Sequence, residues 1–183
     1  MIRCFLFLCL LGLALASPGQ SVHTIGFYNL ENLFDTEDDP EKNDEDFTPE
    51  GRNQWTGERY RQKLDNMAKV MAGIGHGNDP ELIGLCELEN RRVIEDLVQH
   101  PTLAAKRYQI VHFESPDRRG IDVALVYKPQ VFQPFATAQV EISFPGEPDY
   151  KTRNALVVSG LMEKDTLTLI VNHWPSRRGG GED

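Results

Sequence analysis

The stretch ELIGLCELEN at Glu81–Asn90 decides how the rest of the chain is interpreted. Its run is short and mostly apolar, which is typical of a strand buried within a sheet, so we predict a strand over Glu81–Leu88. The run ends in two acids, Glu87 and Glu89. Ligand sites of α/β sheets lie at strand ends, so these acids stand where such a site is expected.

The segments on either side of this stretch alternate between strand and helix patterns. Apolar residues recur at helical spacing in Gly57–Ile74 and in Asn90–Gln99. From short β-branched, aromatic or alternating runs, further strands are predicted at Val22–Tyr28, Tyr108–Phe113, Ile121–Tyr127, Asn154–Leu161 and Thr166–Asn172, with one or two more within Val131–Phe144. Strands outnumber helices, which indicates an α/β chain with a mixed sheet or a sandwich rather than a regular βαβ series.

The composition is that of a globular domain. The 183 residues are 40% apolar and 26% charged, which excludes a wholly disordered chain, a collagen-like fibre and a polytopic membrane protein. The formal net charge of −9 argues against a broad basic surface for nucleic acid, although it is compatible with a metal-dependent nuclease. Thr36–Thr56 is rich in acids, contains Pro40, Pro49 and Gly51, and has no apolar period, so we predict a long surface loop there.

The N-terminus has the pattern of a signal peptide. Arg3 gives a positive start, Cys4–Leu15 is apolar and Ala14–Ala16 is a small-residue cleavage pattern, so we predict a signal peptide over residues 1–16 and a domain over residues 17–183. The apolar run is shorter than the roughly 20 residues of a membrane span. We therefore expect a secreted or periplasmic protein with no stable membrane insertion after cleavage. Cleavage would leave Cys86 as the one thiol, and its apolar neighbours predict that it is buried.

Polar residues gather where the predicted strands begin or end. Asn29, Glu87 and His173 each follow or end a strand, and Asp122 lies one residue inside another, after the Arg118–Gly120 turn. An amide and a carboxylate on neighbouring strands suit a hard divalent cation such as Mg²⁺. A histidine can hydrogen-bond phosphoryl oxygens, and arginine–glycine pairs offer donors to phosphate.

Each of these residues also has a purely structural explanation. Asn29 can end a strand through turn hydrogen bonds, and Asp122 can occupy a solvent-facing position of its strand. Glu87 can be a surface acid, and His173 can be a satisfied structural histidine beside Trp174. Their spacing therefore indicates a metal-dependent hydrolase without deciding for it.

Four motifs in order resemble the endonuclease/exonuclease/phosphatase family, which includes pancreatic-type deoxyribonucleases, apurinic endonucleases, inositol-polyphosphate 5-phosphatases and sphingomyelinases. They are NLENLFD at Asn29–Asp35, LIGLCELEN at Leu82–Asn90, RRGIDVALVYKP at Arg118–Pro129 and VNHWPSRRGG at Val171–Gly180. The resemblance runs from about Val22 to Gly180, and four ordered motifs are far more specific than one short pattern.

The resemblance implies a fold, a cofactor and roles for single residues. The fold is a four-layered α-β-β-α sandwich of two mixed β-sheets, and the chemistry is hydrolysis of phosphoesters assisted by Mg²⁺ or Mn²⁺. Glu87 matches a metal-binding glutamate, and Asn29 matches an asparagine that orders the metal and the phosphate. His173 matches a histidine that contacts the scissile phosphate, and Asp122 matches a position that supports it. By motif position alone, Glu31, Glu89 and Arg119 lie close to the site, with Arg119 as a phosphate-binding residue.

Two further motifs of the family are missing. One is a Gly-Asp-x-Asn segment that orients phosphate, and the other is an Asp-His pair that activates water; no histidine follows His173. We therefore expect a C-terminally truncated domain that is itself inactive. The function implied for the intact protein is an extracytoplasmic endonuclease or exonuclease acting on nucleic acid. The alternatives are a phosphatase or phosphodiesterase for small or lipid substrates, and a non-catalytic fragment that binds metal or phosphate.

Overall fold

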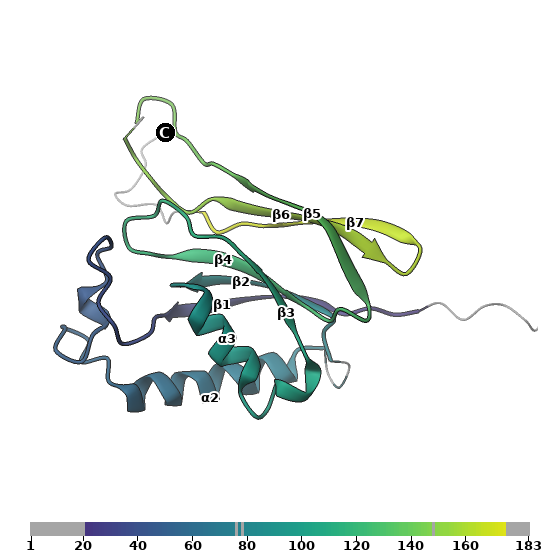
Figure 1. Cartoon of the computed structure of the whole chain (residues 1–183), viewed down its shortest axis with the longest axis horizontal. Coiled ribbons are helices and arrows are strands. Elements are labelled where there is room, and N and C mark those ends of the chain that lie inside the picture. The colour runs from purple at the N-terminus through teal and green to yellow at the C-terminus, as the bar shows by residue number, and fades with distance from the viewer. Residues whose placement is uncertain (1–20, 76, 78, 148, 175–183) are drawn as a thin grey trace, which may run out of the picture.

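The computed structural model describes residues 21–75, 77, 79–147 and 149–174, and it contains two β-sheets (Figure 1). The first sheet has the strand order β1-β2-β4-β3, and the second has the order β5-β6-β7. The strands are β1 (Ile25–Leu33), β2 (Leu82–Leu88), β3 (Gln109–His112), β4 (Asp122–Tyr127), β5 (Phe132–Val140), β6 (Ala155–Met162) and β7 (Asp165–Val171). The helices are α2 (Gly57–Gly73) and α3 (Arg91–Gln99), with 3-10 turns η1 (Glu45–Phe47) and η2 (Ala104–Lys106).

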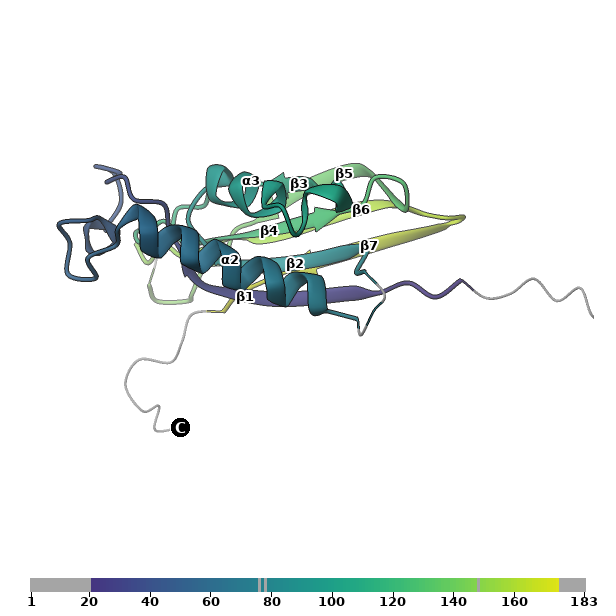
Figure 2. The same cartoon turned by 90° about the horizontal axis from the view of Figure 1, so that it is seen from below.

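Both α-helices cover one face of the first sheet (Figure 2). Each begins at a side-chain cap: Thr56 accepts a hydrogen bond from the Arg59 N–H, and Asn90 accepts one from the Val93 N–H. Such caps satisfy backbone donors that the first turn of a helix leaves free. The apolar faces of the helices then pack on the sheet, in a core that includes Leu64, Met71, Ile83, Leu85, Ile94, Leu97 and Val126.

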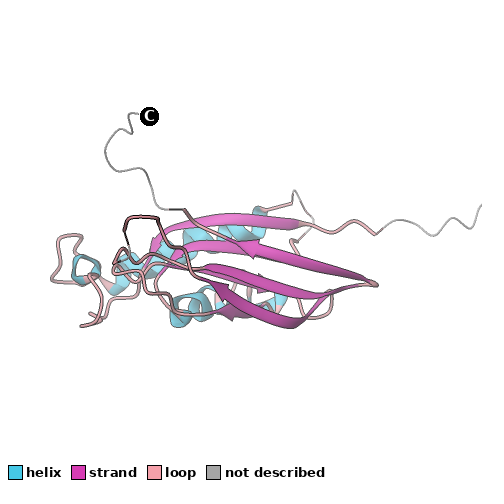
Figure 3. Ribbon diagram, turned by 90° about the horizontal axis from the view of Figure 1, so that it is seen from above, coloured by secondary structure: helices cyan, strands magenta, loops and turns pink. Residues whose placement is uncertain are grey.

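The other face of the first sheet packs against the second sheet, so the layers run helix, sheet, sheet (Figure 3). This second core contains Leu82, Cys86, Val123 and Leu125 from the first sheet, and Phe132, Leu156, Val158 and Val171 from the second. A Cβ atom at Gly84 would meet Val171 at 3.3 Å, so glycine lets the two sheets approach closely there. The strand β2 is therefore buried on both faces, as its apolar run predicts.

This arrangement confirms the α/β sandwich class, with two differences in detail. The first sheet is mixed, because β1 runs parallel to β2 while β4 runs antiparallel to it. The second sheet is antiparallel throughout, where a mixed sheet was expected. In the part of the chain that the structure describes, helices cover only the first sheet, so the fourth layer is not seen there.

Most elements lie close to their predicted bounds, but the first strand and the acidic loop differ. The strand β1 continues to Leu33, beyond the predicted end at Tyr28, because Glu31 and Asn32 take positive φ angles of 52° and 62° in a bulge that restores pairing with β2. The loop 36–56 is anchored by aromatic residues rather than only solvated. The rings of Phe34 and Phe47 stack at 4.1 Å, and Trp55 Nε1 donates to the Phe34 carbonyl at 3.0 Å.

The predictions about export and the thiol have different outcomes. Met1–Ala16 lies outside the described residues, so the signal peptide stays a prediction. Among the helices that are described, none has both the length and the apolar character to cross a membrane. Cys86 is 1% exposed, which confirms that it is buried.

Candidate functional site

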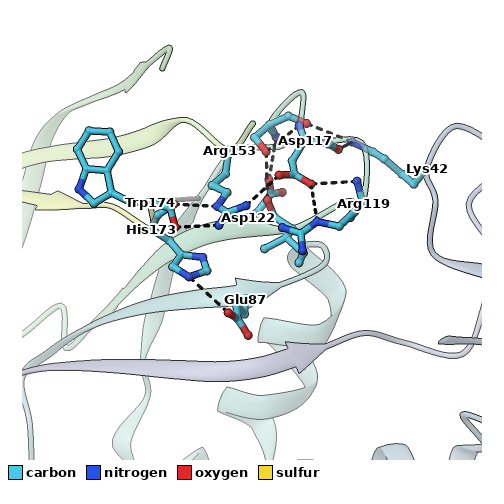
Figure 4. A network of polar contacts seen from close by, with 10 residues as sticks. Lys42, Glu87, Asp117, Arg119, Asp122, Arg153, His173 and Trp174 are labelled. Atoms are coloured by element: carbon cyan, nitrogen blue, oxygen red, sulfur yellow. Dashed lines mark hydrogen bonds and ion pairs between the residues drawn. The ribbon is translucent and has the colours of Figure 1, made fainter. Parts of the chain in front are cut away.

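The ends of β2 and β7 bring an acid and a histidine from different sheets together (Figure 4). His173 Nε2 lies 3.4 Å from Glu87 Oε1, and the two side chains are 22% and 21% exposed. Glu87 has a φ angle of 57° within a bulge between Cys86 and Leu88, so its side chain departs from the buried pattern of β2. The sequence predicted both residues for the site, and the fold places them in contact although they are far apart in the chain.

A buried arginine that the sequence analysis missed holds the His173 segment in place (Figure 4). Arg153 is 4% exposed and lies just before β6. Its Nε donates to the His173 carbonyl at 2.8 Å, and its Nη2 donates to the Trp174 carbonyl at 3.0 Å. Its Nη1 donates to Asp117 Oδ2 at 3.2 Å, which gives the buried charge a partner. In the sequence, Arg153 and Lys151 both stand just before the apolar run of β6, and nothing sets the arginine apart.

The loop between β3 and β4 supplies this partner and places a second arginine nearby. Asp117 is buried, and its Oδ1 accepts a hydrogen bond from the Arg119 N–H at 2.9 Å. The chain then turns at Gly120, whose φ angle of 71° favours glycine. The Arg119 side chain is 45% exposed, and its charge is close enough to His173 to lower the pKa of the imidazole. Arg119 is therefore near enough for its charge to act on His173, with its guanidinium half open to solvent, and its phosphate-binding role stays a prediction.

The His173 imidazole is held in its neutral form. Burial lowers its pKa most, followed by the positive charge of Arg153, while the Glu87 carboxylate acts in the opposite direction. A neutral imidazole has one nitrogen that donates and one that accepts. Its Nδ1 is buried and has no hydrogen-bond partner among the described residues. The nitrogen that faces the site is Nε2, beside Glu87, and it is the one that can hydrogen-bond an oxyanion there.

Asn29 and a lysine complete the surroundings of Glu87. Asn29 pairs in register with Cys86, the neighbour of Glu87, and its Oδ1 accepts a hydrogen bond from the Glu31 N–H at 2.7 Å. Lys63 of α2 donates to the Glu31 carbonyl at 2.7 Å. Burial lowers the pKa of Lys63, and the carboxylates of Glu31 and Glu87 oppose that shift. Lys63 is a second residue that the sequence analysis missed, because nothing in its helical position distinguishes it from a solvated lysine.

Asp122 lies at the same end of the first sheet but contacts other groups. It pairs across the strands with Leu88. One carboxylate oxygen accepts from the Ser115 N–H at 3.0 Å, and the other lies 3.0 Å from His112 Nε2. No contact among the described residues joins Asp122 to His173. Its predicted support of His173 therefore stays a prediction, and the structure gives it a different partner.

The contacts of Glu89 lie in the acidic loop. Glu89 is 6% exposed, and its Oε2 accepts a hydrogen bond from the Asp35 N–H at 2.7 Å. Burial first, and then the charges of Asp35 and Asp44, raise its pKa to about 8, against the hydrogen bond from the Asp35 N–H, which lowers it. Glu89 therefore carries a proton at neutral pH, which distinguishes it from Glu87.

The Glu87 end of the sheet has the oxygen ligands that a hard divalent cation requires. Among the described residues the Glu87 carboxylate has one polar side-chain neighbour at the site, His173, whose Nε2 lies 3.4 Å from Oε1. The amide oxygen of Asn29 on the neighbouring strand keeps a second lone pair after its bond to Glu31. Carboxylate and amide oxygens are ligands that Mg²⁺ and Mn²⁺ accept. The residues present therefore fit the predicted cation.

The comparisons with known proteins agree with this architecture. The model of the endonuclease/exonuclease/phosphatase family matches residues 24–183. Humanized D. rerio TDP2 has a TM-score of 0.50 at 13% identity, over 81% of this chain and 45% of that chain. The mannosyl-6-phosphatase Bt3783 of Bacteroides thetaiotaomicron has a TM-score of 0.49 at 12% identity, over 81% of this chain and 50% of that one. None of the curated proteins matches the chain.

The likeness to TDP2 concerns the fold alone, because the sequence identity is 13%. The chain spans half or less of the length of each of these two solved structures. The site must therefore be interpreted from the side chains of this molecule.

Proposed function

The chain belongs to the endonuclease/exonuclease/phosphatase family, and we propose that it is a metal-dependent phosphoester hydrolase. The observation that carries this proposal is the 3.4 Å contact of Glu87 with His173, which joins strand ends of the two sheets. We further propose an extracytoplasmic phosphodiesterase of the nuclease type. The predicted signal peptide supports the location, and the exposed Arg119 beside His173 supports a phosphate ligand.

Each residue of the site has a separate task in this proposal. Glu87 and Asn29 hold Mg²⁺ or Mn²⁺, which when bound offsets negative charge on the phosphoryl group. Arg119 binds a non-bridging phosphate oxygen through charge-assisted hydrogen bonds. His173, neutral because of its lowered pKa, donates a hydrogen bond to charge that develops on an oxygen at phosphorus. Arg153 holds the carbonyls of His173 and Trp174, the backbone that directly follows the imidazole, and so helps to fix its orientation.

The surroundings of Arg119 bear on the size of the substrate. The Arg118–Gly120 turn offers local phosphate contacts of the kind that position nucleic acid without reading its sequence. A cavity of about 290 Å³ beside the same loop is lined by the acids Asp35, Glu37, Asp38, Asp39 and Glu114, by the protonated Glu89 and by one cation, Lys42, among others. Such an acidic wall repels a long polyanion. It favours, as a second candidate function, hydrolysis of a small phosphoester.

The test measures metal-dependent binding as well as turnover, because the resemblance implies a water-activating pair that the 183 residues lack. We expect Mg²⁺ or Mn²⁺ to promote binding of a phosphorothioate dinucleotide to the wild-type chain, measured by calorimetry. Glu87→Gln should weaken this binding by about tenfold or more, because the amide keeps the shape and removes the charge. Glu141→Gln is the matched control, since Glu141 is 61% exposed and pairs with Lys151.

Equal metal-dependent binding by the two variants would show that Glu87 is a bystander. Binding and turnover are then compared between the dinucleotide and p-nitrophenyl phosphate. A clear preference for the dinucleotide supports the nuclease type, and a preference for the monoester supports the small-substrate alternative.

A further inference from the structure

A second group of ligand-type side chains lies where β3 and β4 meet, apart from the Glu87–His173 contact. His112 ends β3, Glu114 follows it, and Asp122 begins β4. Each offers one ligand atom, and these atoms all lie within 4.8 Å of one another. His112 and Glu114 have no part in the phosphoester chemistry proposed above. Asp122 has only its predicted support of His173.

The group is compact enough for one ion to bind it after small side-chain adjustments. With one ligand atom taken from each residue, the three atoms lie within 4.8 Å of one another, and the His112 Nε2 to Asp122 Oδ2 distance is 3.0 Å. Adjacent ligands on an ion with bonds of about 2.1 Å are separated by about 3.0–3.4 Å. The side chains of His112 and Asp122 are 3% and 2% exposed, so a bound ion would be largely shielded from water.

The charges in the group need compensation. The ligand atoms of Glu114 and Asp122 belong to two carboxyl groups that lie within 4.8 Å of one another beside the buried His112. Two carboxyl groups so close are stabilised by a shared proton or by a cation between them. The ammonium of Lys42 is not hydrogen-bonded to either carboxyl group, because it donates to the carbonyls of Ser115 and Asp117.

A route for a cation leads to the group from the acidic cavity. The Glu114 side chain is 60% exposed and lines the cavity of about 290 Å³ together with acids of the loop 36–56. A negatively charged opening raises the local concentration of cations. Glu114 both lines the cavity and belongs to the group, so its side chain can bind an ion that arrives through the cavity.

We propose that His112, Glu114 and Asp122 bind one divalent transition-metal ion, of the Zn²⁺ or Mn²⁺ class, separate from the cation at Glu87. One imidazole nitrogen with two carboxylates suits these ions better than Ca²⁺ or Mg²⁺, which take oxygen ligands. The ion ties the start of the loop 113–121 to β4. That loop carries Asp117, the partner of Arg153, so the ion stabilises the support of His173 from a distance.

The test is zinc binding by the full chain, measured by equilibrium dialysis and metal analysis. Glu114→Gln is the main variant, because its exposed side chain can change without loss of packing. We expect it to weaken binding of one zinc ion by about tenfold or more, while Glu141→Gln and Glu87→Gln retain that ion. Zinc should also raise the Tm of the wild-type chain and of Glu87→Gln, and not that of Glu114→Gln.

Three results would overturn the proposal. They are wild-type zinc affinity in Glu114→Gln, loss of the ion in Glu87→Gln instead, and no zinc retained by the wild-type chain, which would indicate a shared proton. If Glu114→Gln does not fold, the proposal is tested instead on the wild-type chain loaded with Co²⁺. Co²⁺ should then shift an imidazole proton signal in the NMR spectrum, and that signal should persist in His173→Gln. Its absence, or its loss in that variant, would place the ion elsewhere.

Discussion

The two sheets contribute to the candidate site in different ways. The strands β2 and β4 of the first sheet are buried on both faces, whereas the second sheet exposes Phe135, Leu161 and Ile170 to 61%, 43% and 67%. Glu87 comes from the covered sheet and is positioned by its core. His173 comes from the less covered sheet, and its segment is positioned by the buried Arg153. A carboxylate fixed by packing and a histidine fixed by an ion pair should therefore respond differently to substitution.

The largest effect is expected from Arg153→Met. The methionine fills a similar volume but removes the buried cation from Asp117 Oδ2, and it leaves that carboxylate with only the half-exposed Arg119, whose Nε lies 3.5 Å from Oδ1. Removing one partner of a buried ion pair costs about 3–5 kcal/mol. Urea unfolding followed by circular dichroism measures this loss, with Arg153→Lys as the control that keeps the charge. A loss below about 1 kcal/mol would contradict a supporting role for this arginine.

A second pair of substitutions compares the sheets directly. Leu85→Ala empties part of the helix-covered core of the first sheet and should cost about 2–5 kcal/mol. Leu161→Ala on the second sheet, at a side chain that is 43% exposed, should stay within about 0.5 kcal/mol. The free energies of unfolding are measured under the same conditions. Equal costs would show that the outer face of the second sheet is covered in solution.

The second sheet nevertheless has one tightly packed position. A Cβ atom at Gly160 would clash with the Phe132 ring and would lie 2.8 Å from the Gln133 carbonyl oxygen. Gly160→Ala should therefore destabilise the chain by about 1–3 kcal/mol. Gly73→Ala at the end of α2 is the control, because a Cβ atom there meets nothing within 4 Å. A thermal melt of Gly160→Ala that matches the control would show that the clash is relieved at little cost.

The smallest effect is a pH dependence that arises beside the first sheet. The folded-state pKa of Glu89 is raised from 4.5 to about 8, so its contribution to stability is complete below pH 4.5 and is lost as the pH rises toward 8. Between pH 7 and pH 8 the loss should be about 1 kcal/mol. Glu89→Gln should remove this slope, since the amide is neutral at both pH values. An unchanged slope in this variant, measured by urea unfolding, would assign the proton to another group.

The sequence predicted the elements that have a regular pattern of apolar residues, and the site residues that stand at the end of such a pattern. Helical spacing located α2, and the apolar run located β2, because periodic burial leaves a trace in the order of residues. Glu87 and His173 were predicted because each follows such a run. Their contact depends on how the two sheets pack, and no local pattern contains that information.

The residues that were missed act through single long-range contacts. Arg153 and Lys63 look like ordinary surface cations in the sequence, and only the fold shows that one is buried and the other lies near Glu87. Asp122 was predicted from a motif, but its partner His112 comes from the neighbouring strand. In the loop 36–56 the acids obscured the aromatic anchors Phe47 and Trp55, because composition hides a few apolar contacts in a charged segment.

Because Cys86 is buried between the two sheets, the rate at which its thiol is alkylated reports how often the sheets separate. Burial raises the pKa of this thiol to about 11, so little thiolate exists at neutral pH, and an alkylating reagent can reach the sulfur only when β2 parts from the second sheet. Once residues 1–16 are removed, no other cysteine competes for the reagent. Cys86 is the immediate neighbour of Glu87. Its alkylation rate with the candidate site empty and with the site occupied therefore shows whether occupancy changes how often the sandwich opens.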